Sequence, residues 1–273
     1  MHPPDGGAAL DQITFDSAQP ANDCFGRLNM NPRINDQLAG EVIRAIKRGD
    51  LDSLQRILAV NPGLPAARIG DARGSKGLLH VVTDWPGFFP NGPAVVKMLI
   101  AAGSDANART EGAKNEPGET PLQYAASNDD VEVAEVLILG GADIEARGGS
   151  IAGGTALENA IGYGCWRVAR LLIHHGAKVE KLWHAAAIGT TSMLEKFIQE
   201  SSPLSSEEVN HAFWHACRGG YRRTAEYLFA RGADPNWIPD YAKETPLEVA
   251  DSGGQDTGRE ALVNWLREKR CAR

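Results

Sequence analysis

Residues 117–147 read PGETPLQYAASNDDVEVAEVLILGGADIEAR, and this stretch decides the fold. Thr120 and Pro121 suit the start of a short helix, because threonine caps a helix and proline fits its first turn. After a polar turn, apolar residues recur at helical spacing up to Gly140 and Gly141, where glycine readily takes a C-cap conformation. The stretch therefore predicts two helices with a single apolar side, which must be buried against neighbouring units.

The TPLQYAA start and the LGGADIEAR end resemble the ankyrin repeat, whose signature is a TPLHxA helix start and a period near ~33 residues. The resemblance implies an all-α solenoid of stacked helix-turn-helix repeats with short finger loops, and no strand pattern is visible. Residues 1–34 are expected to form a mostly irregular arm, and residues 35–270 to form the solenoid. Seven similar units, of which the two terminal ones are charged like capping repeats, cover approximately 35–67, 76–109, 117–147, 152–179, 180–201, 205–237 and 243–270.

Composition limits the partners that the chain is expected to bind. A formal net charge of −7 over 273 residues argues against nucleic acid, which needs a basic face. No apolar run reaches membrane-spanning length, and no signal peptide is visible, so we expect no membrane partner. The four cysteines are scattered without a CxxC pair and are expected to be free thiols. We therefore predict a cytoplasmic protein.

The loop at 84–93, DWPGFFPNGP, is the most unusual segment of the chain. It adds about five residues to the second repeat, and its prolines and glycines exclude a helix. One tryptophan and two phenylalanines are hard to reconcile with a solvated loop. Two interpretations stay open: the rings fold back onto the solenoid as a plug, or they present an aromatic anchor to a partner.

The connections between repeats are also irregular. The segment 109–119, RTEGAKNEPGE, is longer than an ordinary finger by about five residues, and it places Arg109 and Lys114 at the rim of the expected binding face. By contrast, the finger between Gly176 and Glu180 is missing. We expect the repeats on either side of that gap to pack with altered spacing or twist.

Aligning the repeats as columns places Trp183 and Trp214 in the column of the TPLH histidine, with His184 and His215 one position later. In ankyrin repeats that histidine is structural and bonds the backbone of the adjacent finger, and we expect this of His80. The two Trp-His pairs have two open interpretations. The indoles fill the space left by the missing finger, or the pairs form a polar-aromatic binding patch.

No signature of catalysis is present, since GxSxG, P-loop, HExxH and dinucleotide motifs are all missing from the sequence. His211 and His215 stand at i, i+4 on one expected helix, with His184 as a conceivable third metal ligand. No carboxylate or thiolate has matching spacing, so we predict neither a metal nor a cofactor.

The sequence thus favours a non-catalytic scaffold that binds another protein through the concave face and the finger loops. The alternative is a small-molecule pocket, with or without catalysis, in which Glu158, His184 and His215 converge and the 84–93 loop closes one end. The residues that we expect to contact a partner are Trp85, Phe88, Tyr124, Glu158, Tyr163, Trp183, His184, Trp214 and His215.

Overall fold

A computed structural model describes residues 36–71, 74–112, 118–200, 203–253 and 257–271. The arm expected at 1–34 and the predicted rim residue Lys114 lie outside these ranges. The described chain groups into two compact units, with a boundary between Ala177 and Lys178. We call residues 36–177 the N-terminal unit and residues 178–271 the C-terminal unit. The boundary falls in the segment where the sequence lacks a finger.

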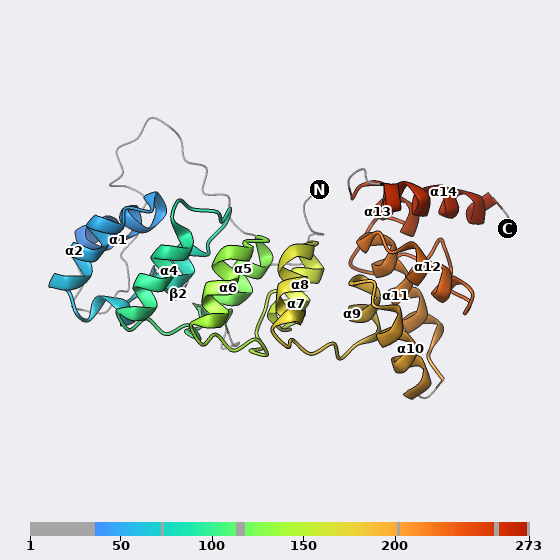
Figure 1. Ribbon diagram of the computed structural model, residues 1–273, viewed down its shortest axis with the longest axis horizontal. Coiled ribbons are helices and arrows are strands. Elements are labelled where there is room, and N and C mark those ends of the chain that lie inside the picture. Colours follow the sequence, from blue (N-terminus) through green and yellow to red (C-terminus); the bar gives the residue numbers. More distant parts are fainter. Residues whose placement is uncertain (1–35, 72–73, 113–117, 201–202, 254–256, 272–273) are drawn as a thin grey trace. The chain divides into compact units, whose positions relative to one another are not determined.

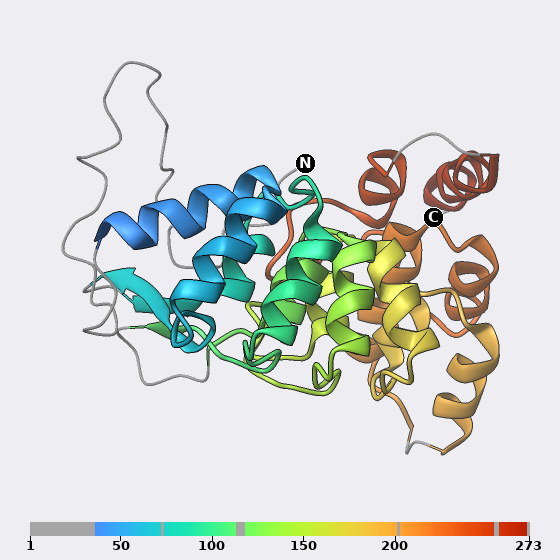
Figure 2. The ribbon, with the colours of Figure 1, turned by 60° about the vertical axis from the view of Figure 1, so that its left-hand side comes forward.

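The N-terminal unit consists of successive pairs of short helices. First helices contact one another in the order α1, α3, α5, α7, and second helices in the order α2, α4, α6, α8. Figures 1 and 2 show the second helices lying side by side. The pairs are α1 (Asp36–Arg48) with α2 (Leu51–Val60), α3 (Leu78–Val82) with α4 (Gly92–Ala101), α5 (Pro121–Ser127) with α6 (Val131–Leu139), and α7 (Ala156–Tyr163) with α8 (Trp166–His174).

Local sequence explains the bounds of α5 and α6. Thr120 is the N-cap of α5, where its hydroxyl accepts a hydrogen bond from the Gln123 backbone N–H, and Pro121 is the first helical residue. Helix α6 ends at Leu139, and Gly141 follows with a φ of 92°, a conformation that costs glycine little. The predicted start and end of this repeat are therefore confirmed.

The prediction of a chain without strands was wrong. Three short strands, β1 (Arg68–Asp71), β2 (Gly74–Gly77) and β3 (Glu111–Gly112), form one antiparallel sheet in the order β1-β2-β3. All three come from segments that connect helix pairs, and a 3-10 turn at Leu64–Ala66 precedes β1. The Arg68 guanidinium ties the sheet together, because it donates to the carbonyl oxygens of Ser75 and Arg109 at 3.0 and 2.6 Å.

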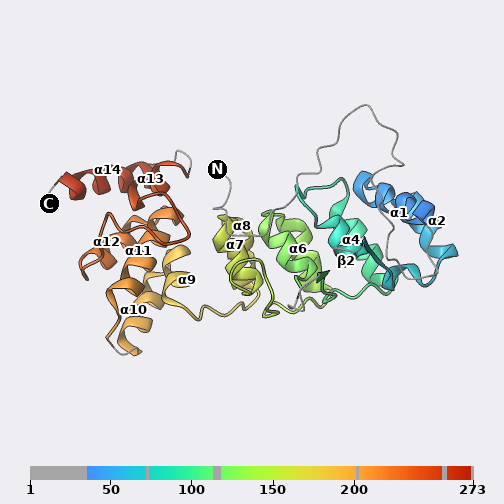
Figure 3. The same cartoon turned by 180° about the vertical axis from the view of Figure 1, so that it is seen from behind.

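The C-terminal unit repeats the paired arrangement. Helix α11 contacts α9 on one side and α13 on the other, and α10, α12 and α14 pack against their own partners in each pair. Figure 3 shows these helices from behind. Their bounds are α9 (Leu182–Ala187), α10 (Thr191–Glu200), α11 (Ser206–Gly219), α12 (Arg222–Phe229), α13 (Pro246–Asp251) and α14 (Thr257–Cys271).

Two further expectations concern the described residues. Cys165 and Cys217 are buried free thiols, as the scattered cysteines predicted. None of the described helices is long and apolar enough to cross a lipid bilayer.

Candidate functional site

His80 has the structural role that we expected of it. Its Nε2–H donates to the Glu119 carbonyl oxygen at 3.0 Å, and its Nδ1 accepts from the Gly77 N–H at 3.2 Å. The ring is fully buried, and burial lowers the pKa of His80 to about 4. The neutral tautomer with hydrogen on Nε2 is therefore the one that fits this position.

Two other side chains in the same column make the same bond. Gln123 Nε2 donates to the Gly154 carbonyl oxygen at 3.0 Å, and Trp214 Nε1 donates to the Glu244 carbonyl oxygen at 2.9 Å. Like Glu119, these two acceptors directly precede the N-cap of the next first helix. We call these positions the linking column. Trp214 is almost fully buried, so its indole ties one helix pair to the next finger.

The turns that follow the first helices confirm the alignment of this column. In three of these turns a backbone N–H donates to an alanine carbonyl oxygen: Asp130 to Ala125, Thr190 to Ala185 and Tyr221 to Ala216. Counting back two residues from each alanine gives Gln123, Trp183 and Trp214. The histidines of the WHAA and WHAC motifs therefore stand one position past the linking column, as predicted.

Three predicted contact residues belong to first helices of the N-terminal unit. Tyr124 is half-buried with its ring edge-on to His80 at 5.3 Å, and burial raises the pKa of its phenol. Glu158 is buried, and its carboxylate accepts from the Thr155 N–H at 2.7 Å, which caps α7. The Tyr163 hydroxyl lies 3.2 Å from the Ser150 hydroxyl.

The C-terminal unit holds a cluster of stacked rings. Trp183 stacks on His215 with ring centroids 4.8 Å apart, and it meets His184 edge-on at 4.2 Å. The Tyr241 hydroxyl lies 2.5 Å from His211 Nε2 and 3.0 Å from His215 Nε2. Trp183 and the two buried histidines thus come together, and Tyr241 joins them from the finger. Convergence of Glu158 with these histidines remains a prediction, because Glu158 belongs to the other unit.

Burial disfavours the charged forms of His211, His215 and Tyr241 in this cluster. It lowers the pKa of His211, which the neighbouring charge of Asp240 partly opposes, and it lowers the pKa of His215 well below the ordinary value. Burial also raises the pKa of the Tyr241 phenol. Within the described ranges, no three histidine, cysteine or acidic side chains are placed to hold a metal ion. The cluster therefore offers stacking surfaces and hydrogen-bonding groups.

The three rings of the aromatic loop at 84–93 differ in exposure. Trp85 is 75% exposed and Phe88 is 59% exposed, whereas Phe89 is half-buried with the Lys47 ammonium 5.7 Å from its ring centroid. The loop is tied to its neighbours, because Phe88 donates its backbone N–H to Asp130 Oδ2 at 3.0 Å. Phe89 packs inward, while Trp85 and Phe88 face solvent from a backbone that is held in place.

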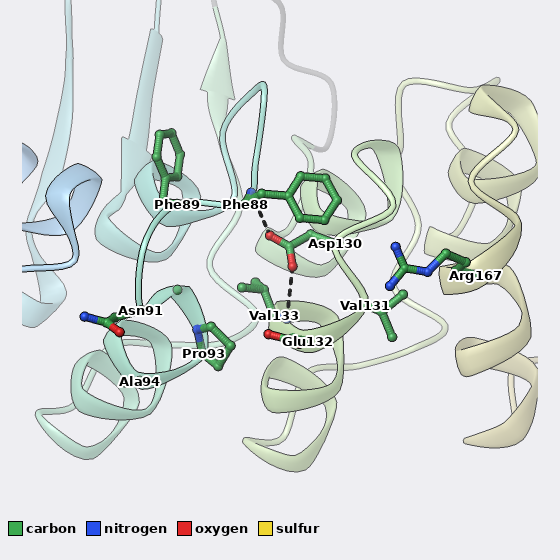
Figure 4. A pocket seen from close by; sticks show the side chains of 11 residues that line it. Phe88, Phe89, Asn91, Pro93, Ala94, Asp130, Val131, Glu132, Val133 and Arg167 are labelled. Carbon is green, nitrogen blue, oxygen red and sulfur yellow. Dashed lines mark hydrogen bonds between the residues drawn. The ribbon is translucent and has the colours of Figure 1, made fainter.

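A cleft of about 530 Å³ opens beside Phe88, where the first turns of α4, α6 and α8 meet. Figure 4 shows the Phe88 ring beside Asp130, and Arg167 reaching from α8 towards Val131. Asp130 and Arg167 line this cleft but are not among the contact residues predicted from the sequence. Arg167 did carry a signal, because a cation is electrostatically disfavoured in the first turn of a helix.

The family model described as ankyrin repeats (3 copies) matches residues 88–181 of this chain. That segment contains α4 and the pairs α5 with α6 and α7 with α8, so the ankyrin resemblance is confirmed there. The full count of seven repeats remains a prediction. The chain is also 32% identical over 174 residues to the ankyrin repeat and KH domain-containing protein mask-1 of Caenorhabditis elegans. The match covers 64% of this chain, which spans only about 6% of the length of that relative.

Proposed function

We propose that the chain is a non-catalytic scaffold that binds another protein through the faces and loops of one ankyrin-type stack over residues 35–270. The observation that carries the proposal is the pair of exposed aromatic side chains, Trp85 and Phe88, on the held loop. Large exposed aromatic residues are typical of interaction surfaces, where they contribute much of the binding energy.

The way in which the loop is held supports this role. The Asn128 side chain donates to the Thr83 carbonyl oxygen at 2.9 Å, and the Lys76 ammonium pairs with Asp84 at 2.6 Å. These bonds hold the two residues directly before Trp85, and the bond from the Phe88 N–H to Asp130 holds the backbone after it. A surface that is ordered before binding loses less conformational entropy when a partner arrives, which favours affinity.

The other residues of the proposed binding face divide by exposure. Tyr124, Tyr163 and Trp183 are half-buried, so part of each ring is accessible to a partner. The remaining members are buried and shape the face from beneath by holding neighbouring rings and fingers in place, namely Glu158, His184, Trp214 and His215. The negative net charge supports a protein partner over a nucleic acid, and the scattered cysteines support a cytoplasmic location.

We expect the double variant Trp85→Ala with Phe88→Asn to lose its partner. Phe88 has a φ of 55°, which asparagine tolerates better than alanine, so the variant removes the ring and keeps the backbone. A photo-reactive amino acid at position 85 should crosslink one protein in cells that express the chain. The same crosslinker at Leu139, which is 72% exposed elsewhere on the unit, should not capture it.

Affinity for the captured protein should then fall by roughly a hundredfold in the double variant, because each aromatic anchor is worth about 1–2 kcal/mol or more. A Leu139→Ala variant should bind like the wild type. Equal crosslinking at positions 85 and 139, or unchanged affinity of the double variant, would contradict the proposed scaffold role of this loop.

A further inference from the structure

The cleft beside Phe88 has an apolar lining along one side. The Phe88 ring, Pro93 and Val131 are all at least partly exposed there, and Val133 is buried at its base. These side chains come from the aromatic loop and from two different helices, as Figure 4 shows. The volume of about 530 Å³ is within the range of ordinary ligand clefts, so it accommodates at least one large side chain of a partner.

The acidic groups of the cleft are already stabilised within the unit. Asp130 accepts two backbone hydrogen bonds, from Phe88 at 3.0 Å and from Val133 at 3.3 Å, one on each carboxylate oxygen. Glu132 stands in the first turn of α6, where the helix dipole favours a negative charge. Neither group requires a cation from a partner.

Arg167 is the basic residue of the cleft lining. It is exposed in the first turn of α8, where the helix dipole disfavours a cation. Among the residues that the structure describes, no carboxylate lies within ion-pairing distance of its guanidinium. Charge complementarity at this end of the cleft therefore favours an anion.

We propose that this cleft binds a segment of the partner protein in which an aromatic or long aliphatic side chain stands close to a carboxylate. The apolar side chain lies between Phe88, Pro93 and Val131, and the carboxylate pairs with the Arg167 guanidinium. This inference rests on the proposed scaffold function and adds the chemistry of the partner. A guanidinium binds a carboxylate through two parallel hydrogen bonds, which fixes the direction of the segment.

A phage-displayed library of random linear peptides, selected on the full chain, tests the proposal directly, because it requires no isolated partner. We expect enrichment of peptides that combine an apolar residue with a nearby aspartate or glutamate. Their affinity should fall roughly tenfold or more in Arg167→Glu, because a charge-assisted bond becomes a repulsion. Phe88→Asn should reduce binding by a similar factor.

Two matched controls distinguish peptide binding in the cleft from general effects of a changed surface charge. Arg170→Glu makes the same charge change at an exposed position of α8 that does not line the cleft, and it should alter affinity less than about threefold. Glu132→Gln removes one of the two acidic groups of the cleft and should leave binding unchanged or slightly tighter. Both variants, like Arg167→Glu, concern exposed side chains, and helical content measured by circular dichroism should match the wild type.

Failure of the library to enrich any peptide that depends on Phe88 would overturn the proposal. So would enrichment of basic peptides whose affinity depends on Glu132 and not on Arg167. Either result leaves the proposed scaffold function standing if crosslinking at position 85 still captures a partner. Loss of that crosslink together with successful peptide enrichment would instead show that the cleft binds while the loop is not the main anchor.

Discussion

Replacement of His80 by glutamine is expected to remove most of the acid sensitivity of the N-terminal unit. In the wild type, burial lowers the pKa of His80 from 6.5 to about 4. Above pH 6.5 the folded and unfolded chains carry the same proton count at this residue. As the pH falls below 6.5, the unfolded chain binds the proton first, so the free energy of unfolding falls until the pH approaches about 4. The full difference is roughly 3 kcal/mol at about 1.4 kcal/mol per pKa unit.

Glutamine is the right replacement because the next repeat already uses it. Gln123 Oε1 accepts from the Thr120 N–H at 2.7 Å, and its amide donates to the Gly154 carbonyl oxygen. These atoms perform the two roles that Nδ1 and Nε2 perform in His80. The amide does not titrate in this range, so the variant retains both bonds at low pH.

Hydrogen exchange of peptides from α3 and α5, measured between pH 7 and pH 4 after correction for intrinsic exchange rates, reads out this local stability. The wild type should lose protection with falling pH, and His80→Gln should lose much less. His174→Gln, at an exposed histidine on α8, should behave like the wild type. An identical loss of protection in His80→Gln and the wild type would show that other groups dominate the acid response.

Replacement of Phe213 by alanine should destabilise the C-terminal unit by about 3–5 kcal/mol. The side chain is fully buried in α11, with Phe229 and Trp265 at centroid distances of 6.4 and 6.5 Å. Its removal leaves a cavity between α11, α12 and α14, whose walls are held apart by the surrounding helices. Phe213→Leu retains most of the volume and should cost less than about 2 kcal/mol.

Urea unfolding, followed by hydrogen exchange, shows which unit loses stability in the variant. Peptides from α11, α12 and α14 should exchange faster in Phe213→Ala, while peptides from α5 and α6 should be unaffected if the two compact units unfold separately. If Phe213→Ala lowered the free energy of unfolding by less than about 1 kcal/mol, the cavity must collapse, and the Phe213 ring would contribute little to the stability of the core.

Sequence reasoning succeeded where local chemistry determines the structure. Thr120 and Gly141 predicted the ends of the third helix pair, and the repeat alignment located the linking column. It failed for the strands, because RIGD and GSKG are short and rich in glycine, and they pair only when neighbouring connections meet in space. For the two Trp-His pairs the sequence left two interpretations open. The structure shows that Trp214 is buried and that its indole N–H donates to the Glu244 carbonyl oxygen, which is a structural role.

The residues that sequence reasoning missed depend on contacts between distant segments. Tyr241 bonds His211 across 30 positions and His215 across 26, so no local pattern marks it. Arg167 becomes a candidate contact residue only in the folded chain, where the first turns of three helices line the cleft beside Phe88. Neither residue belongs to the signature that identified the repeats, which encodes the turns and the apolar side but not the features specific to this chain.

The linking column also bears on how the chain folds. His80, Gln123 and Trp214 each donate an N–H to the finger of the following repeat, which couples the stability of neighbouring pairs. Each of these bonds holds one helix pair to the segment that begins the next pair, so the unfolding of one pair should lower the stability of its neighbour. We therefore expect neighbouring pairs within one compact unit to unfold together rather than one at a time.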